Sequence, residues 1–448
     1  MLATEEFARH AAQLLTSDDE ELVTAMEREH ARQHNSLMLV ASSSVTDPSV
    51  LACLATSSMN VTAEGYPGAR YHAGCEAIDP VERMAVDRAR DLFGAQYANV
   101  QPHSATTANY AVLSAVLDPG DCVLGMRLNH GGHLTHGYSV AYSGTYFTPV
   151  NYGLDERGQI DYDEVAALAA EHRPKLIICG ATAYPRTVDF ARFRAIADSV
   201  GALLMADISH IAGLVAAGLH PSPIDHAHIT TSCTHKQLAG PRGGVIMSGR
   251  DAGTVLPGTG RTIARTLDRA VFPFFQGAPV LPAIAAKARA FALAATDGYR
   301  DTAQRILDDS AALAAELTAL GHDVVTGGSD NHIVLLDLTR DNVSGLAAER
   351  ALESIGIVVN KNRVPGDARP AAITSGVRIG TNAVAQRGLG PREMRTCAGI
   401  IHAVLTAMEP VGDRDFVLDG FTAARLRAEV EKLAAEFPLP RYLPGGQL

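Results

Sequence analysis

The chain has 448 residues, which predicts more than one structural domain, and its 47% hydrophobic and 19% charged residues are typical of a globular protein. A formal net charge of -11 disfavours nucleic acid and anionic lipid as partners, because both would be repelled. No apolar run is long enough to span a bilayer and no signal peptide is recognisable, so we expect a cytoplasmic protein without a membrane partner.

The first two thirds of the chain predict a helical arm followed by a large α/β domain. Helical periodicity over residues 3–33 predicts an arm, placed at 1–35. Beyond it, expected helices at 80–93 and 105–117 alternate with expected strands at 122–125, 176–179, 202–206 and 244–247. This alternation predicts a mostly parallel sheet flanked by helices in a large domain, 36–300.

A smaller α/β domain is predicted for residues 301–448. An alanine-rich helical region, 282–320, leads into it. Its expected strands are 332–338 and 355–359, and its expected helices are 343–354 and 391–408. The fold class is therefore α/β, and ligands of such open sheets bind where the strands end.

The chain holds only five lysines, which makes the search for a reactive amine short. Lys175, Lys287, Lys361 and Lys432 are expected on solvated surfaces. Lys236 differs, because it follows an expected strand end rich in hydroxyl groups, TTSCT, and precedes the glycine-rich turn PRGG. Such a lysine can bind a phosphate as a point charge or form a Schiff base with a carbonyl compound.

An acid and a histidine precede Lys236 by about one strand–helix unit. The expected strand ALLMAD ends in Asp207, and His210 follows it. In a parallel sheet this places a carboxylate and an amine at the same edge. Pyridoxal phosphate requires that pair, an amine for the Schiff base and an acid that keeps the pyridine nitrogen protonated. A structural aspartate that closes a turn is the competing interpretation.

Two further segments suit the same cofactor. QPHSATTAN places Ser104 and Thr106 directly before an expected helix, where free N–H groups and the helix dipole favour a phosphate, although an ordinary N-cap has the same pattern. HGGHLTH, residues 130–136, holds three histidines, but its Gly-Gly interruption and the lack of nearby cysteine or acid ligands argue against zinc. We predict no metal site and expect a histidine of this loop to lie against a flat ring.

Seven segments in constant order resemble those of the serine hydroxymethyltransferase family, fold-type I enzymes that depend on pyridoxal phosphate. The segments are EGYPGARYHAG, YANVQPHSATTAN, HGGHLTHG, MADISHIAGLVAAG, THKQLAGPRGG, SDNHIVLLDL and TSGVRIGT. The resemblance covers about residues 30 to 408. Motifs of this length and number are specific, unlike a lone glycine pattern.

The resemblance implies which residues hold the cofactor. Lys236 would form the Schiff base, Asp207 would pair with the ring nitrogen and His133 would stack on the ring. The other implied contacts are His210 and Thr182 near the phenolic oxygen, and His235, Ser104, Thr106, the amide of Ala105 and Gly277 from the partner subunit at the phosphate.

The resemblance also implies the substrate contacts and an oligomer. Arg378 would bind the substrate carboxylate in a bidentate way, assisted by Ser42. Glu64, reaching in from the other chain, would be the acid/base at the substrate hydroxyl. The implied assembly is a homodimer with shared active sites, or a tetramer, acting on an amino acid and a folate or aldehyde acceptor, with tetrahydrofolate as the family's acceptor.

Four departures from the family pattern surround the expected substrate pocket. Thr62 and His72 each replace a tyrosine, Ser43 stands where an acid is usual, and Phe274 and Phe275 replace two glycines. Neutral drift is a sufficient explanation for Ser43. An imidazole has a reference pKa of about 6.5 against about 10 for a phenol, so His72 can exchange a proton near neutral pH. The missing ring at Thr62 leaves space beside the substrate's α-carbon.

Space beside the α-carbon would admit a second substituent there, such as a methyl group. The leading hypothesis is therefore an enzyme similar to α-methylserine hydroxymethyltransferases, which cleave α-methylserine to D-alanine and pass the one-carbon unit to tetrahydrofolate. The alternatives are a threonine transaldolase, which adds a glycyl unit to another aldehyde, and a standard glycine hydroxymethyltransferase. The presence of Lys236, Asp207, Glu64 and Arg378 argues against a catalytically silent scaffold.

Overall fold

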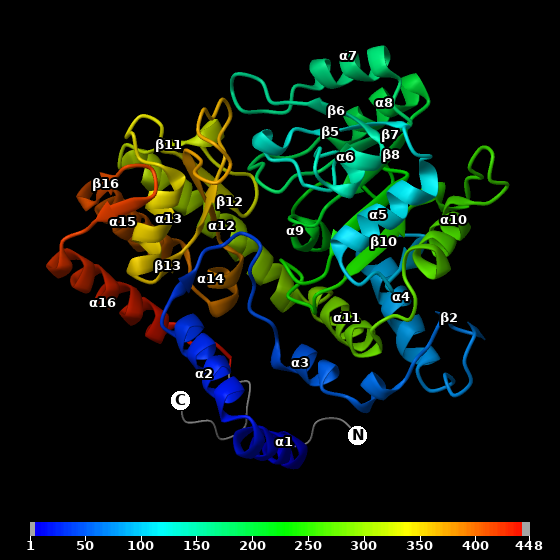
Figure 1. Ribbon diagram of the computed structural model, residues 1–448, viewed down its shortest axis with the longest axis horizontal. Coiled ribbons are helices and arrows are strands. Elements are labelled where there is room, and N and C mark those ends of the chain that lie inside the picture. The colour runs from blue at the N-terminus through cyan, green and yellow to red at the C-terminus, as the bar shows by residue number, and fades with distance from the viewer. Residues whose placement is uncertain (1–4, 441–448) are drawn as a thin grey trace. The chain divides into compact units, whose positions relative to one another are not determined.

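The computed structural model describes residues 5–440 (Figure 1). Packing separates the chain into a central unit, Ser58–Ala303, and a terminal unit formed by the described residues up to Ser57 together with those from Gln304 onward. The predicted domain limits at 35 and 300 stay a prediction. No described helix combines the length and the apolar character that crossing a membrane requires.

The central unit is built on a seven-stranded sheet in the order β4-β10-β9-β8-β7-β5-β6. Its strands are β4 (Tyr97–Asn99), β5 (Cys122–Met126), β6 (Thr148–Tyr152), β7 (Leu176–Cys179), β8 (Leu203–Asp207), β9 (Ile229–Cys233) and β10 (Gly244–Ser248). Strands β6, β5, β7, β8 and β9 are parallel, whereas β10 is antiparallel to both β9 and β4. The predicted α/β fold with a mostly parallel sheet is confirmed.

Helices cover both faces of this sheet. They are α4 (Asp79–Phe93), α5 (Ala105–Val116), α6 (Tyr142–Tyr146), α7 (Tyr162–His172), α8 (Phe190–Val200), α9 (Ala212–Ala216), α10 (Ile263–Arg269) and α11 (Leu281–Ala294). In β7, Ile177 packs in one apolar cluster with residues of α4, α8 and α11, while Ile178 packs in another with residues of α5 and α10. Side chains that alternate between two covered faces explain why these strands are continuous apolar runs.

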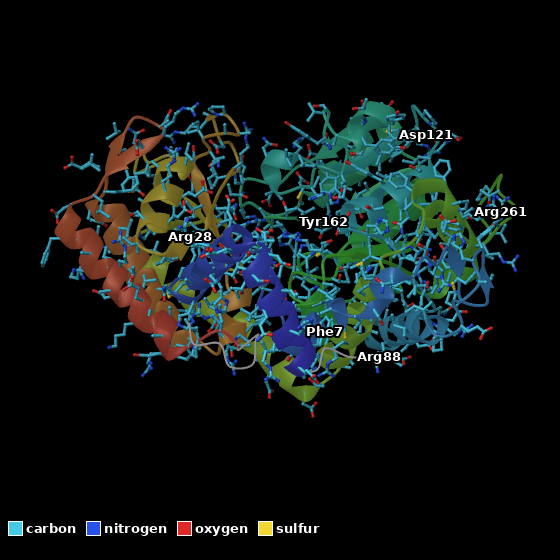
Figure 2. The ribbon with its side chains drawn as sticks, turned by 60° about the horizontal axis from the view of Figure 1, so that its bottom comes forward. Phe7, Arg28, Arg88, Asp121, Tyr162 and Arg261 are labelled. Carbon is cyan, nitrogen blue, oxygen red and sulfur yellow. The ribbon has the colours of Figure 1, made fainter. Side chains whose placement is uncertain are left out.

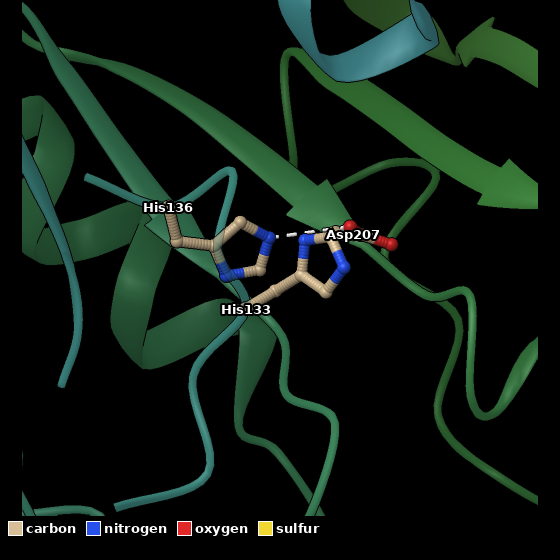
Figure 3. A group of neighbouring side chains, drawn as sticks. All are labelled: His133, His136 and Asp207. Atoms are coloured by element: carbon tan, nitrogen blue, oxygen red, sulfur yellow. Dashed lines mark hydrogen bonds and ion pairs between the residues drawn. The ribbon is translucent and has the colours of Figure 1, made fainter. Parts of the chain in front are cut away.

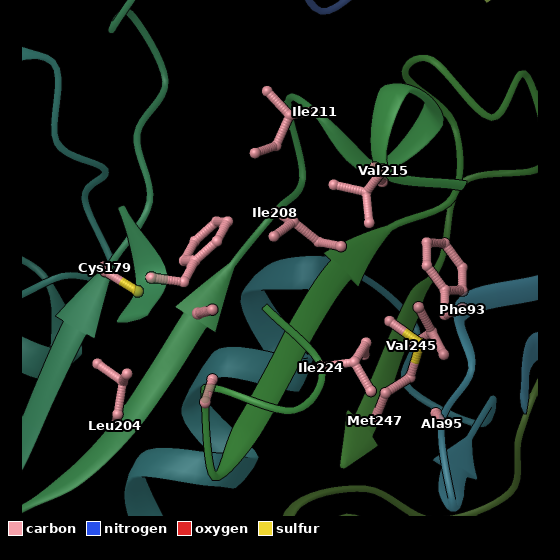
Figure 4. Close-up of a cluster of buried hydrophobic side chains, with 14 of the residues drawn as sticks. Phe93, Ala95, Cys179, Leu204, Ile208, Ile211, Val215, Ile224, Val245 and Met247 are labelled. Carbon is pink, nitrogen blue, oxygen red and sulfur yellow. The ribbon is translucent and has the colours of Figure 1, made fainter. Parts of the chain in front are cut away.

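The larger of these two clusters is dense around the ends of the central strands (Figure 4). On the same side of the sheet, α4 and α11 pack against each other. Arg88 of α4, labelled in Figure 2, donates a hydrogen bond from Nη1 to Ala288 O of α11 at 2.8 Å. The loops at the strand ends, which carry polar side chains, therefore lie next to a well-packed apolar core.

The predicted helical region 282–320 consists of two helices, α11 and α12 (Asp297–Ala319). The break falls at Thr296, whose Oγ1 accepts a hydrogen bond from Tyr299 N at 3.2 Å and so caps the second helix. The terminal unit has a four-stranded antiparallel sheet in the order β11-β12-β15-β14. These strands are β11 (Asp323–Val324), β12 (Ile333–Asp337), β14 (Asn360–Asn362) and β15 (Gly376–Gly380).

The N-terminal segment belongs to the terminal unit, because β1 (Leu37–Met38) pairs in parallel with β13 (Ile357–Val358). Before it lie α1 (Glu5–Asp18) and α2 (Glu20–His34), with Asp19 as the cap of α2. The other helices of the terminal unit are α3 (Pro48–Leu54), α13 (Gly345–Ser354), α14 (Asn382–Arg387), α15 (Pro391–Ala407) and α16 (Gly420–Glu436). Short hairpins are formed by β16 (Glu409–Val411) with β17 (Asp415–Val417) and, in the central unit, by β2 (Gly65–Tyr66) with β3 (Ala69–Arg70).

Candidate active site

The sheet brings Asp207 and Lys236 to the same edge. Asp207 is the last residue of β8 and lies opposite Thr231 of the parallel strand β9. Lys236 follows the end of β9 by three residues, and its charge lowers the pKa of the neighbouring His133. The two residues therefore lie at the same edge of the sheet, as predicted, and their service in one site stays a prediction.

The carboxylate of Asp207 is buried and held by three donors. Its Oδ2 accepts hydrogen bonds from Asn109 Nδ2 at 2.8 Å and His136 Nε2 at 3.2 Å, and its Oδ1 accepts one from Ser209 N at 3.0 Å. Burial alone would raise the pKa of Asp207, but the hydrogen bond and charge of His136 outweigh it and hold the pKa well below its usual range. The ionised carboxylate retains lone pairs for a further N–H donor.

His133 lies beside this pair as a neutral ring (Figure 3). Its Nδ1 accepts the backbone N–H of Thr135 at 3.2 Å and lies 2.7 Å from Thr135 Oγ1, which itself accepts from Asn109 Nδ2 at 2.8 Å. The ring proton is therefore assigned to Nε2. Burial, followed by the charge of His136, lowers the pKa of His133 to about 4, so the imidazole is uncharged at neutral pH. A neutral ring suits stacking against a flat ligand.

The donor set favours an organic ligand over a metal. Donor atoms of His133, His136 and Asp207 all lie within 4.8 Å of one another, close enough to suggest a cation site. However, His136 Nε2 donates to Asp207 and His133 Nδ1 accepts an N–H, so neither lone pair faces a shared centre. A buried anion with one spare acceptor beside a neutral ring instead fits the protonated ring nitrogen of pyridoxal phosphate.

Thr182 fixes the glycine loop that carries His133. Its backbone N–H donates to Gly131 O at 2.7 Å and its Oγ1 donates to Gly132 O at 2.9 Å. Gly131 has φ +101°, and a side chain there would collide with Ala183 C at 3.2 Å. His210 is buried in the turn that follows β8. The predicted contacts of Thr182 and His210 with the cofactor's phenolic oxygen stay a prediction.

The N-terminus of α5 offers free backbone donors. Ser104 Oγ accepts Thr107 N at 3.0 Å and caps the helix, which leaves the N–H groups of Ala105 and Thr106 without a carbonyl one turn earlier. His235, beside Lys236, is also uncharged, because burial and then the charge of Arg242 lower its pKa to about 4. These groups can donate hydrogen bonds to an anion.

Glu64 and His72 approach each other in a more exposed part of the central unit, and Thr62 lies two residues before Glu64 in the chain. His72 Nε2 lies 3.4 Å from Glu64 Oε2, and the two side chains are 46% and 37% exposed. Glu64 and Gly277 are the two residues predicted to reach into the active site of the partner subunit. They are neighbours in one chain, because a Cβ built on Gly277 would lie 3.4 Å from Glu64 Oε1. The side chain of Thr62, nearby in the sequence, is exposed.

A buried ion-pair network holds the hairpin that follows Glu64. The carbonyl of Gly65 accepts hydrogen bonds from Arg70 Nη1 at 2.7 Å and from Gln101 Nε2 at 2.9 Å. Arg70 in turn bonds Glu82 at 2.5 Å and Asp79 at 2.9 Å. The backbone beside Glu64 is thus fixed although its side chain is partly exposed.

The terminal unit carries Arg378 and Ser42. Arg378 lies on β15, is 9% exposed and donates from Nε to Asn360 Oδ1 at 3.1 Å. Burial lowers its pKa to about 10, so the guanidinium remains charged at neutral pH. Ser42 follows Ala41, whose carbonyl accepts from His332 Nε2 at 3.2 Å and Asn382 Nδ2 at 2.9 Å.

One expectation about the lysines is wrong. Lys287 was predicted on a solvated surface but is 2% exposed, because α11 is buried on nearly all sides. Its Nζ donates to Val100 O, Pro102 O and Gly244 O. Lys175, by contrast, forms an exposed ion pair with Asp121 at 2.6 Å, as expected of a surface lysine.

Sequence reasoning missed the residues that hold Asp207 and His133. His136 belongs to the histidine-rich loop but received no role, and Asn109 and Thr135 were not considered. The sequence held a usable sign for Asn109. It lies one helical turn after Thr106, a predicted phosphate contact, and it is buried in α5. For His136 the local sequence gives no sign that its ring reaches the end of β8.

Comparison with known proteins accounts for both units. A family model described as serine hydroxymethyltransferase matches residues 15–401. Serine hydroxymethyltransferase 1 of Pseudomonas aeruginosa is 48% identical over 424 residues, which are 94% of this chain and 97% of the relative. The similarity therefore extends over the strand-edge cluster, the Glu64 group and the segment that carries Arg378.

Proposed function

We propose that this chain, which belongs to the serine hydroxymethyltransferase family and is therefore a pyridoxal phosphate-dependent transferase, uses α-methylserine as its substrate. The family reaction moves a hydroxymethyl group between a β-hydroxy amino acid and tetrahydrofolate. The proposed version breaks the Cα–Cβ bond of α-methylserine, releases D-alanine and passes the one-carbon unit to tetrahydrofolate.

Pyridoxal phosphate, when bound, supplies an electron-accepting ring that weakens the bonds to the substrate's α-carbon. Lys236 is proposed to hold the cofactor's aldehyde carbon covalently, and Asp207 to keep the proton on its ring nitrogen. The low pKa of Asp207 supports this role, because an ionised acid attracts that proton. His133 is proposed to cover the ring, and its lowered pKa supports this role because the imidazole is then uncharged.

The phosphate is proposed to bind at the start of α5. Hydrogen-bond donors there are supplied by Ser104, Thr106 and the amide of Ala105. His235 of the same chain and Gly277 of the partner subunit complete the set. The support is that the N–H groups of Ala105 and Thr106 have no carbonyl one turn earlier, and that the helix dipole is positive at this end of α5. Backbone donors of this kind are held in place and need no rearrangement when the anion binds.

Arg378 is proposed to bind the substrate carboxylate, with Ser42 assisting. Two parallel hydrogen bonds from a guanidinium fix the carboxylate's orientation, and this orientation decides which bond of the α-carbon is aligned for cleavage. Glu64 is proposed to take the proton of the substrate hydroxyl, from its place on the partner subunit. Asn360, which bonds Arg378 Nε, supports the guanidinium geometry.

The observation that carries the choice of substrate is the pair of replacements beside Glu64. Threonine at position 62 is smaller than the family's tyrosine and leaves room for a methyl group on the α-carbon. His72 places an imidazole 3.4 Å from the Glu64 carboxylate, where the family has a phenol. An imidazole at this position can share the proton that Glu64 takes from the hydroxyl.

Product analysis of the wild-type enzyme tests the proposal. α-Methylserine, serine and threonine are each incubated with and without tetrahydrofolate and with and without a panel of acceptor aldehydes, and the amino-acid products are separated and quantified. We expect folate-dependent D-alanine from α-methylserine, with kcat/KM exceeding that for serine. Cleavage of serine alone would identify a standard enzyme, and folate-independent coupling of threonine to other aldehydes would identify a transaldolase. If the protein binds no cofactor, and borohydride attaches no cofactor to Lys236, the chain is a catalytically silent scaffold.

A further inference from the structure

Lys287 is a buried cation whose donors are all occupied by backbone carbonyls. Its Nζ donates to Val100 O at 2.6 Å, to Gly244 O at 2.9 Å and to Pro102 O at 3.0 Å. An ammonium group has three N–H donors, so none is left for another partner. The side chain is 2% exposed and lies on α11, away from the exposed face of the unit.

These three carbonyls belong to two segments of the candidate site. Val100 and Pro102 lie in the loop between β4 and α5, which leads directly to Ser104. Gly244 begins β10, and its N–H also bonds Pro102 O at 2.9 Å. The ammonium therefore cross-links the loop before α5 to the segment that follows the turn after Lys236.

The turn after Lys236 is shaped to admit this lysine. A Cβ built on Gly243 would lie 2.3 Å from Lys287 Cε and 2.8 Å from its Nζ, so any larger residue there would force the end of the lysine side chain to move. Gly243 O accepts the N–H of Thr234 at 3.1 Å, two residues before Lys236. The glycine-rich PRGG motif thus accommodates Lys287 as well as turning the chain.

Electrostatics favour an anion in this neighbourhood. Burial lowers the pKa of Lys287 to about 7, with a smaller opposing effect from Glu82, so the positive charge is costly where it stands. A negative group at the nearby start of α5 would stabilise it and would be attracted by the helix dipole as well.

We propose that Lys287 is a positioning residue for the cofactor's phosphate. Its three hydrogen bonds fix the loop that ends at Ser104, so that the first N–H groups of α5 are held where the phosphate binds. The proposal rests on the phosphate site at Ser104, Ala105 and Thr106 described under the proposed function. Lys287 acts through the backbone and does not touch the cofactor's reacting atoms.

Binding of two forms of the vitamin to the apoprotein tests this role. Calorimetry compares pyridoxal 5'-phosphate with pyridoxal, which lacks the phosphate, on the wild type, Lys287→Met and Gly243→Ala. For Lys287→Met we expect the Kd for pyridoxal 5'-phosphate to rise about 10- to 100-fold, the effect of losing hydrogen bonds from a charged donor. The Kd for pyridoxal should change by less than about threefold. Gly243→Ala, which displaces the side chain without removing its charge, should shift the ratio in the same direction.

Three controls separate the possible causes. Lys432→Met removes an exposed lysine of α16 and should leave both affinities unchanged. Ser104→Ala tests the phosphate site itself: if it does not weaken the phosphorylated form selectively, the placement of the phosphate is wrong. Suppose that Ser104→Ala is selective. If Lys287→Met and Gly243→Ala then lower the affinities for pyridoxal 5'-phosphate and for pyridoxal equally, or lower neither affinity, the role of Lys287 is overturned. Should Lys287→Met fail to fold, Gly243→Ala decides.

Discussion

The strand-edge cluster around Asp207 and the group around Glu64 differ in how tightly the fold constrains them. Asp207 is 7% exposed and accepts three hydrogen bonds, whereas Glu64 and His72 are 37% and 46% exposed and approach each other at 3.4 Å. Both regions contain residues of the family motifs, Asp207 in MADISHIAGLVAAG and Glu64 in EGYPG, but of the two regions only the second holds replacements, at Thr62 and His72. The fold buries Asp207 and holds it with hydrogen bonds, whereas Thr62 and His72 stand at exposed positions that can change with little loss of packing.

The largest predicted effect comes from separating the two regions onto different chains. Lys236→Ala and Glu64→Gln should each abolish turnover as pure proteins. After subunit exchange, an equal mixture should regain about one quarter of the wild-type activity, because half of the dimers are mixed and each mixed dimer has one complete site of two. Activity assays before and after exchange give the result. Mixed dimers without activity would mean that Glu64 serves its own chain.

A smaller loss is expected when only the charge of Asp207 is removed. Asp207→Asn keeps the shape but removes the anion that His136 and Asn109 hold, so kcat should fall roughly 10²- to 10³-fold, as for loss of one preorganised electrostatic partner. Steady-state kinetics and cofactor content after dialysis measure the effect. Asp121→Asn, which disrupts an exposed ion pair, is the matched control and should leave kcat unchanged. A full-rate Asp207→Asn enzyme would refute the assigned role.

A buried carboxylate without a hydrogen-bonding network extends the comparison to stability. Asp309 of α12 is fully buried, and neither carboxylate oxygen has a hydrogen-bond partner in the described part of the chain. Burial raises its pKa to about 8, well above the value of about 3.9 in the unfolded chain. The folded protein therefore binds more protons between about pH 4 and 8, and the free energy of unfolding falls as pH rises through that range.

Asp309→Asn should remove this pH dependence. The variant should unfold at a Tm a few degrees above the wild type at pH 8 and closer to it at pH 5. Scanning calorimetry at both pH values gives the comparison, with Asp301→Asn, at an exposed position of the same helix, as a control. An equal shift at pH 5 and pH 8 would show that packing, and not ionisation, controls the difference.

The positions of Asp207 and Lys236 at one edge of the sheet could be predicted because the signals for strand ends are local in the sequence. Strands β8 and β9 are apolar runs followed by polar residues, and parallel strands end at the same edge, so Asp207 and Lys236 had to be neighbours. The α/β class followed from the same alternation. The cofactor itself was inferred from the chemistry that this pair supports together with the family motifs.

Tertiary contacts decided what could not be predicted. Lys287 was misplaced because a lysine in a helix ordinarily points to solvent, and only the burial of α11, which packs against α4, shows otherwise. The absence of acidic residues in Leu281–Ala294 was a usable sign of burial. The break between α11 and α12 had a local signal in the Thr-Asp-Gly sequence at 296–298, which is typical of a helix start.

The most direct test of substrate choice is the ratio of kcat/KM for α-methylserine to that for serine in Thr62→Tyr and Thr62→Val. Restoring the tyrosine should lower this ratio by about 10- to 200-fold, the range for one methyl group in a filled pocket, whereas valine keeps the space and should leave the ratio close to that of the wild type. A ratio that is unchanged in Thr62→Tyr, or that falls equally in both variants, would contradict the claim that the space at position 62 selects the substrate.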